Sequence, residues 1–427
     1  MTRMVTSLSA LILSIVLLVS GNAFLMTLLG IRLSIEQVPP DVIGWVLVCY
    51  SIGFVLGTLY VHRIIGRVGH IRAFAALAAL AAVVSLMYPM AVSTVFWAVL
   101  RVLSGFTVAG VLVVIESWFS SRATNANRGA LFAVYQIVFY LSAASGQLLV
   151  NVGDPANFMP FSLAAILLTL ALVPLSLTRM EAPVIEDSGH LSLLTLARES
   201  FSGVAGALVC GVLIGAFYAL GPVYATLSGL DPGGTSAFMA SAIVAAMLLA
   251  WPMGIICDRF DRRRVMFVVA LVAAVSAGAI AVLGIGSLWL ATLLVGLFTG
   301  LSANVYPIAV AITNDRMESH RIVAASATLL LSYGVGSVIG PVVMGQMIAL
   351  LGPPGLFMGS AGFLVVLAVI TRYRISQTVD VPVDEQEHFV SAMPEASSVI
   401  AEIDPRNEAF AASSDPDENS LDFGKSA

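Results

Sequence analysis

The chain has 427 residues, of which 59% are hydrophobic and only 11% are charged, and its mean hydropathy is +0.98. A soluble domain of this size needs far more polar surface to cover its core, so the composition excludes an ordinary soluble protein. The formal net charge of −5 is the sum over two regions of opposite sign.

Apolar stretches recur along the chain, and each is long enough to cross a hydrocarbon core of about 30 Å as a helix. A helix satisfies its own backbone hydrogen bonds in lipid, so we expect helices and not strands. We predict twelve spans, at residues 7–31, 42–65, 72–92, 95–118, 129–151, 159–178, 201–227, 236–257, 265–285, 288–313, 322–350 and 355–373. The predicted fold class is therefore an all-α membrane protein with twelve transmembrane helices.

The longest internal polar stretch, residues 179–200, divides the spans into two groups of six. The groups resemble each other, since RIIGRVGHIR (63–72) after span two aligns with DRFDRRR (258–264) after span eight. Such repetition is typical of transporters built from related bundles around a central path. We predict two pseudo-symmetric six-helix bundles, residues 1–178 and 201–373, joined by a cytoplasmic linker.

The membrane part contains 18 arginines and no lysine. Sixteen of them lie at the N-terminus, in alternate loops or just after span twelve. The exceptions are Arg32, in the first outer loop, and Arg101, inside span four. This asymmetry predicts a multi-pass protein of the cell (inner) membrane with both termini in the cytoplasm.

Residues 374–427 form a tail of different composition. From residue 375 onward the tail holds 12 of the 25 acidic residues and two basic ones, a net charge of −10. This charge and a weak hydrophobic pattern predict a disordered, solvated cytoplasmic tail. The alternative is that the tail docks on the arginine-rich cytoplasmic face.

Charged residues end span eight in the order Gly254-x-x-x-Asp258-Arg259-x-x-Arg262-Arg263. A topological anchor explains the arginines but not the aspartate before them. The order resembles the signature loop of the major facilitator superfamily: glycine, three residues, Asp-Arg, one residue, Gly-Arg-Arg. The resemblance implies that Asp258 caps a neighbouring helix end and pairs with an arginine across the two halves, contacts that stabilise one state of a carrier.

Both copies of this loop depart from the family pattern. Asp261 replaces the family's glycine in the second copy. In the first copy Gly66 stands in the aspartate position, and Arg67 and Arg72 follow it. The first copy retains its cations and lacks its acid, so we expect the inward gate to rely more on the second loop.

Three longer stretches resemble the YcaD-like subfamily of this superfamily. They are NRGALFAVYQIVFYLSAASGQLLV (127–150), GALVCGVLIGAFYALGPVY (206–224) and YPIAVAITNDRMESHRIVAASATLLLSYGVGSVIGP (306–341). The resemblance covers roughly residues 8–373 and leaves out the acidic tail. It implies the family fold, in which spans one, four, seven and ten line the path.

Arg101 lies about six residues into span four. A buried arginine costs at least about 2.5 kcal/mol on membrane-insertion scales, so it is expected to face a cavity or a partner. The order Arg101-x-x-x-Gly105 resembles the family's span-four motif, which implies a role in proton coupling. We expect an anion-binding or coupling site, the alternative being a structural cap for neighbouring carbonyls.

Glu116 lies 15 residues further along the same predicted helix. We expect it to form a structural, state-dependent ion pair with Arg122, Arg128 or the loop after span two, the alternative being a proton carrier.

Polar and aromatic side chains in the spans give further candidates for substrate binding, with helix packing as the alternative for each. They are Asn22, Tyr218, Tyr224, Asn304, Tyr306, Gln136, Tyr140, Trp251 and Tyr333, with Arg32 at the outer mouth, where a solvated rim is the alternative. The glycine-rich stretch SYGVGSVIGP (332–341) is expected to let helices pack closely.

The sequence contains no HExxH motif, no glycine-rich phosphate loop and no cysteine–histidine cluster, so we predict neither an enzyme nor a cofactor. No acidic residue lies near the middle of spans seven to twelve, which argues against coupling through a central carboxylate there.

We predict a monomeric secondary active or facilitative transporter that works by alternating access. Its partners are the lipid bilayer and a small organic solute, alone or with a proton in symport, and no nucleic acid. The solute is expected to be anionic, because the only deep charge is a cation. The alternatives are an efflux carrier for amphipathic compounds and, from another class, a non-transporting scaffold or sensor that uses the acidic tail.

Overall fold

The computed structural model describes residues 2–120, 128–177, 192–317 and 321–377, and residues 382, 386, 389–391 and 393 of the tail. The helices are α1 (Thr2–Ile35), α2 (Pro40–Val68), α3 (His70–Met87), α4 (Thr94–Ser120), α5 (Arg128–Leu148), α6 (Met159–Leu170), α7 (Leu172–Ser176), α8 (Leu193–Glu199), α9 (Phe201–Leu227), α10 (Pro232–Arg259), α11 (Arg262–Leu283), α12 (Leu288–Asn314), α13 (Ile322–Leu351) and α14 (Gly355–Gln377). Two 3-10 turns, η1 (Tyr88–Met90) and η2 (Leu149–Asn151), extend α3 and α5.

Within the described ranges, twelve helices are long and apolar enough to cross a membrane. They correspond in order to the twelve predicted spans, with ends that differ by several residues. The sixth span is interrupted at Ala171, where α6 ends and the short α7 begins. The ring of Pro174 accounts for this break, because a proline clashes with the carbonyl four residues earlier, here that of Leu170.

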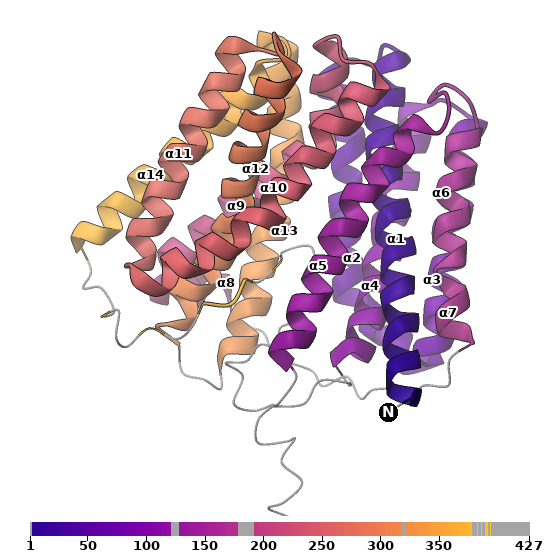
Figure 1. The fold of residues 1–427 in the computed structure, drawn as a ribbon, viewed down its shortest axis with the longest axis horizontal. Coiled ribbons are helices and arrows are strands. Elements are labelled where there is room, and N and C mark those ends of the chain that lie inside the picture. The colour runs from indigo at the N-terminus through magenta and orange to yellow at the C-terminus, as the bar shows by residue number, and fades with distance from the viewer. Residues whose placement is uncertain are drawn as a thin grey trace, which may run out of the picture.

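The helices form two bundles, α1–α7 and α9–α14, which stand side by side in Figure 1 as an indigo-to-magenta group and a rose-to-yellow group. Equivalent helices pair in both bundles. Helix α1 packs on α5 as α9 packs on α13, α2 on α4 as α10 on α12, and α3 on α6 as α11 on α14. This correspondence confirms the predicted fold of two pseudo-symmetric six-helix bundles.

The polar stretch between the bundles contains the short helix α8, which the sequence did not predict. The Arg321 guanidinium, just before α13, pairs with the Glu199 carboxylate at the end of α8 at 3.0 Å. The described part of the linker is therefore attached to the second bundle.

The glycine-rich stretch of α13 packs closely against α9. A Cβ on Gly336 would lie 2.0 Å from the carbonyl oxygen of Leu208, and one on Gly340 would lie 2.2 Å from that of Val212. Only residues without a Cβ permit this approach of the two backbones. The predicted packing role of residues 332–341 is confirmed.

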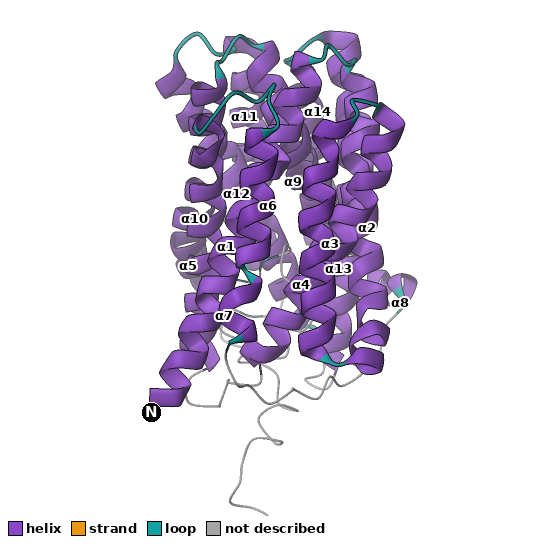
Figure 2. Cartoon of the chain, turned by 90° about the vertical axis from the view of Figure 1, so that its right-hand side faces the viewer, coloured by secondary structure: helices purple, strands orange, loops and turns teal. Residues whose placement is uncertain are grey.

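We call the end where α1 begins, and where the α2–α3 and α10–α11 connections lie, the arginine-rich end; it is the lower end in Figure 2. The two bundles meet directly at the opposite end. There, a Cβ on Gly44 of α2 would lie 2.4 Å from the carbonyl oxygen of Pro341 in α13. There too, the Ser236 hydroxyl of α10 donates to the carbonyl of Gln147 in α5 at 2.7 Å.

Candidate functional site

A cavity of about 160 Å³ lies between the two bundles, near the middle of the helices. The first bundle contributes Val19, Asn22, Ala23, Met26, Thr27, Leu47, Tyr50, Ser51, Phe54, Leu112, Phe139, Ala143 and Gln147. The second contributes Gly215, Tyr218, Ala219, Met239, Ile243, Tyr333 and Ser337. Both bundles therefore build the wall, and none of these lining residues is charged.

The polar groups of the wall are fixed by hydrogen bonds within the first bundle. The Asn22 amide of α1 donates to the Tyr50 hydroxyl of α2 at 3.1 Å. The Thr27 hydroxyl donates to the Gln147 side-chain oxygen, and the Gln147 amide donates to the carbonyl of Ala23 at 3.4 Å. These bonds tie α1 to α2 and α5, so the polar side of the cavity is held in one arrangement before any solute binds.

Arg101 lies behind this wall and not in it. Its side chain is 1% exposed, and its guanidinium carbon lies 4.6 Å from the centre of the Tyr50 ring. The Nη2 atom contacts the Met26 sulfur at 2.8 Å. Among the described residues no carboxylate forms an ion pair with it, and the stacking on Tyr50 is a cation–π contact.

Two further Arg101 nitrogens, Nε and Nη1, have no hydrogen bond of ordinary geometry to the described residues, although the buried Tyr88 lies beside the guanidinium. The guanidinium is thus one side-chain layer from the cavity, separated from it by Tyr50 and Met26.

Three of the sequence-predicted residues, Asn22, Tyr218 and Tyr333, line the cavity together. Tyr306 of α12 lies behind Tyr333, with the two ring centres 5.7 Å apart. The structure thus brings one residue of α1, one of α9 and one of α13 to the same space.

The remaining predicted cavity residues lie elsewhere. Asn304 is buried in α12 and donates to the carbonyl of Gly300 at 2.7 Å. Tyr224 packs edge-on against Phe357 in an aromatic cluster of the second bundle. Trp251 is 77% exposed on the surface of α10.

On α5 and at the outer end, three more predicted residues do not line the cavity. Gln136 donates to the carbonyl of Ser391 in the tail, and Tyr140 packs edge-on against Phe139. Arg32 pairs with Glu36 at 2.7 Å and donates to the carbonyls of Pro155 and Ala156.

The expectation that spans one, four, seven and ten line the path is met only in part. Helix α12, the tenth span, contributes no lining residue, because α10 and α9 pack over it. Helices α2, α5, α10 and α13 supply most of the remaining wall, since they face the partner bundle at the interface. Asn304 and Tyr306 are consequently buried behind the wall.

The second charged loop holds a buried ion network. Arg262 is 2% exposed at the start of α11, pairs with Asp315 after α12, and lies 3.9 Å from Asp258. It also donates to the carbonyl of Ala311 at 3.4 Å. Asp258 thus lies within ion-pair distance of an arginine of its own bundle, and the partner across the two halves that the resemblance implied stays a prediction.

Asp261, which replaces the family's glycine, caps α11. Its carboxylate accepts the Arg264 backbone N–H at 2.9 Å, as an N-cap aspartate does. The N-cap of α11 is therefore Asp261, and the capping role that the resemblance gave to Asp258 stays a prediction.

The other predicted gating residues lie near this ion network or at the equivalent loop of the first bundle. Gly254 lies against the Phe389 ring of the tail, Arg263 is buried, and Arg259, Arg67 and Arg72 are exposed at the arginine-rich end.

Glu116 is fully buried near the same end and accepts a hydrogen bond from the Tyr135 hydroxyl of α5. Of its predicted partners, Arg122 and the Arg128 side chain lie outside the described residues.

Tyr50 and Gln147 are two polar wall residues that the sequence did not predict. Gln147 carries an amide inside an apolar span, and that signal alone could have marked it. Tyr50 lies on the second span, which the family pattern did not place on the path.

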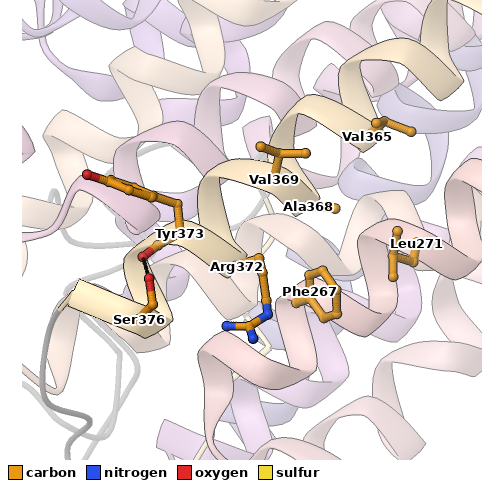
Figure 3. A pocket seen from close by; sticks show the side chains of 8 residues that line it. All are labelled: Phe267, Leu271, Val365, Ala368, Val369, Arg372, Tyr373 and Ser376. Atoms are coloured by element: carbon orange, nitrogen blue, oxygen red, sulfur yellow. Dashed lines mark hydrogen bonds between the residues drawn. The ribbon is translucent and has the colours of Figure 1, made fainter.

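A second, larger hollow of about 530 Å³ lies on the outside of the second bundle between α11 and α14 (Figure 3). Phe267, Leu271, Val365 and Val369 form its apolar wall, and Arg372 lies at one end. Only one bundle lines it, and none of the predicted site residues does. The central cavity is therefore the candidate site.

The chain resembles a known protein family, individual relatives in that family and solved structures. The family model of the Major Facilitator Superfamily matches residues 5–251 and 229–402. An uncharacterized MFS-type transporter YcaD of Salmonella newport (strain SL254) is 31% identical over 331 residues, which cover 77% of this chain and 85% of that protein. An uncharacterized MFS-type transporter of Enterobacter sp. (strain 638) is 30% identical with the same coverage.

Solved structures share the fold at lower identity. The nucleoside transporter NupG has a TM-score of 0.71 and 16% identity, covering 87% of this chain and 99% of its own. A bacterial homolog of the human lysosomal transporter Spinster, in an inward-facing and occupied conformation, has a TM-score of 0.73 and 13% identity over 89% of this chain and 98% of its own. The chain therefore belongs to the Major Facilitator Superfamily, as a multi-pass membrane transporter related to YcaD and not as an enzyme.

Proposed function

We propose that the chain carries a small organic solute through the central cavity by alternating access. The observation that carries this proposal is the shared wall, to which α1, α2 and α5 contribute from one bundle and α9, α10 and α13 from the other. A solute held there contacts both bundles, so its binding energy depends on their relative position.

The wall favours an uncharged solute with hydrogen-bonding groups on an apolar frame. Asn22, Gln147 and Tyr218 offer amide and hydroxyl groups, and the side chains between them are apolar. An ion would lose its hydration beside a wall without a counter-charge, which is unfavourable. This proposal replaces the sequence-based expectation of an anion, because the guanidinium on which that expectation rested lies behind Tyr50.

An anionic solute is the second candidate, and one observation favours it. Arg101 is separated from the cavity by a single layer, so a rotation of the Tyr50 ring would bring the guanidinium to the wall. In that case Arg101 would attract a carboxylate or phosphate, as an arginine in a low-dielectric site does.

We further propose that the arginine-rich end faces the cytoplasm, that the protein resides in the inner membrane, and that it acts as a monomer. The positive-inside rule supports the orientation. No lining residue of the cavity is acidic, which favours facilitated diffusion over proton symport at this site.

The test is a binding screen followed by uptake into liposomes, with and without a pH gradient. Nucleosides, sugars, neutral amphipathic compounds and small carboxylates serve as probes, nucleosides because NupG, named as a nucleoside transporter, has the same fold. We expect thermal stabilisation by a neutral compound, and uptake that does not need the gradient.

Variants assign the site. Asn22→Leu and Tyr218→Leu should each weaken binding about tenfold or more, the effect of losing one hydrogen bond at a buried site. Trp251→Phe, on the exposed surface of α10, is the matched control and should bind normally. Binding of carboxylates alone, lost in Arg101→Gln, would establish the anionic candidate instead.

A further inference from the structure

Part of the C-terminal tail returns to the membrane domain and lies between the bundles. Helix α14 ends at Gln377, and residues 389–391 and 393 then lie against α10 and α5. Figure 1 draws this stretch as a thin yellow trace in the half of the molecule where the N-terminus lies. We call residues 389–393, of which all but 392 are described, the strap.

The strap contacts the second bundle at its charged loop. The Phe389 backbone N–H donates to the Asp258 carboxylate at 2.7 Å. A Cβ on Gly254 would lie 3.4 Å from Cδ1 of the Phe389 ring, so the ring lies on the face that the glycine leaves flat. The glycine and the aspartate that carry the family motif are therefore both occupied by the chain's own tail.

Described residues of the strap also contact the first bundle. The Gln136 amide of α5 donates to the Ser391 carbonyl. Val390 packs against an apolar cluster formed mainly by the first bundle, and Met393 is a buried member of it with 4% exposure. A side chain so deeply buried is fixed by packing and is not lying loosely on the surface.

The strap also lies next to the cavity. Gln136 precedes Phe139, a wall residue, by three positions, or about 4.5 Å along the helix. Met393 belongs to the same apolar cluster as Phe139 and Ile243, which line the cavity from opposite bundles. The strap is therefore at the arginine-rich side of the cavity, and the direct contacts of Gly44 and Ser236 are at the other.

We propose that the strap is an autoinhibitory plug, seated in the interface between α5 and α10, that closes the cavity toward the arginine-rich end. It binds both bundles at once, so any rocking that changes the separation of α5 and α10 must break one set of its contacts. Transport then requires the strap to leave. This regulatory role rests on the alternating-access function proposed above.

A cross-link tests whether the strap occupies this seat. With the three native cysteines replaced by serine, the pair Gln136→Cys and Ser391→Cys should be joined in membranes by a short bifunctional thiol-reactive reagent, because the Gln136 side chain reaches the Ser391 backbone. Each single-cysteine variant is the control and should form no intramolecular cross-link. Absence of the cross-link in the pair would overturn the proposal, whether or not transport is detected.

Cavity accessibility tests whether the strap closes the path, and needs no known solute. In the cysteine-free chain, Ala143→Cys in the wall is labelled by an impermeant maleimide added from the arginine-rich side. Met393→Glu, which cannot remain buried, should raise the labelling rate at least fivefold, as should deletion of residues 388–427. Met393→Leu, which can remain buried, should leave the rate unchanged.

Equal labelling rates in Met393→Glu, the deletion and the intact chain would overturn the plug. Transport of an identified solute should rise in the same variants. If the cross-link and the labelling changes occur while no solute is carried, the position and closing role of the strap are supported and the proposed transport function fails.

Discussion

The two copies of the charged loop occupy equivalent places in the two bundles but are built differently. In the first, Gly69 alone joins α2 to α3 with a φ of 85°, and Arg67 and Arg72 are exposed. In the second, Asp261 caps α11 and Arg262 is buried between acids. The duplication therefore preserved the position of the loop and not its chemistry.

The residues at equivalent positions explain the difference. A buried arginine is tolerated when a carboxylate pairs with it, as Asp315 does for Arg262. The first copy has Gly66 where the second has Asp258 and His70 where the second has Arg262, and its arginines Arg67 and Arg72 remain exposed. The second copy can consequently hold a fixed network and receive the tail, whereas the first is a simple turn.

Removal of the buried cation should have the largest effect on this comparison. Arg262→Ala leaves Asp315 buried without its partner, and we expect a loss of about 3–5 kcal/mol in the free energy of unfolding. Arg72→Ala, at an exposed arginine of the first copy, should change it by less than about 0.5 kcal/mol. Unfolding in detergent, followed by tryptophan fluorescence, measures both. Equal shifts in the two variants would contradict the contrast between the loops.

The turn of the first copy should be sensitive to backbone strain. Gly69 has φ 85° and ψ 160°, a region open almost only to glycine, so Gly69→Ala should destabilise by about 1–3 kcal/mol. Gly66, three residues earlier within α2, has nothing within 4 Å of an added Cβ. Gly66→Ala should therefore stabilise by about 0.5–1 kcal/mol. The same unfolding measurement tests both variants. A destabilising Gly66→Ala would show that an added methyl group is not accommodated at this position, which would contradict the prediction.

The cap of the second copy should have the smallest effect. Asp261→Ala removes the acceptor of the Arg264 N–H, which should cost about 1 kcal/mol. Asp261→Asn keeps an acceptor of similar capping strength and should retain most of the stability. If both variants unfold at the temperature of the unaltered protein, the cap contributes nothing and the loop is held by Arg262 alone.

Much of the fold could be predicted from the sequence. The twelve apolar stretches specify twelve helices, because lipid leaves the backbone no other way to satisfy its hydrogen bonds. The internal repeat gave the two bundles. The break in the sixth span was missed because Pro174 lies inside a stretch whose hydropathy alone is continuous.

The candidate site was harder to predict. Asn22, Tyr218 and Tyr333 line the cavity, but Tyr50 and Gln147 do so as well and were not expected. Trp251 and Asn304 had suitable chemistry and face elsewhere. Hydropathy places a residue at a depth in the membrane, yet the rotation of each helix about its axis follows from packing against its neighbours.

Composition, hydropathy and the repeat determined by themselves that this chain is a membrane transporter of two related bundles, since each depends on local chemistry and on chain order. Only the tertiary structure decided that Arg101 lies behind Tyr50, that Arg262 pairs with Asp315, and that Met393 of an acidic tail is buried beside the cavity. These contacts join residues far apart in the chain. Their formation depends on how the bundles pack, which no local pattern records.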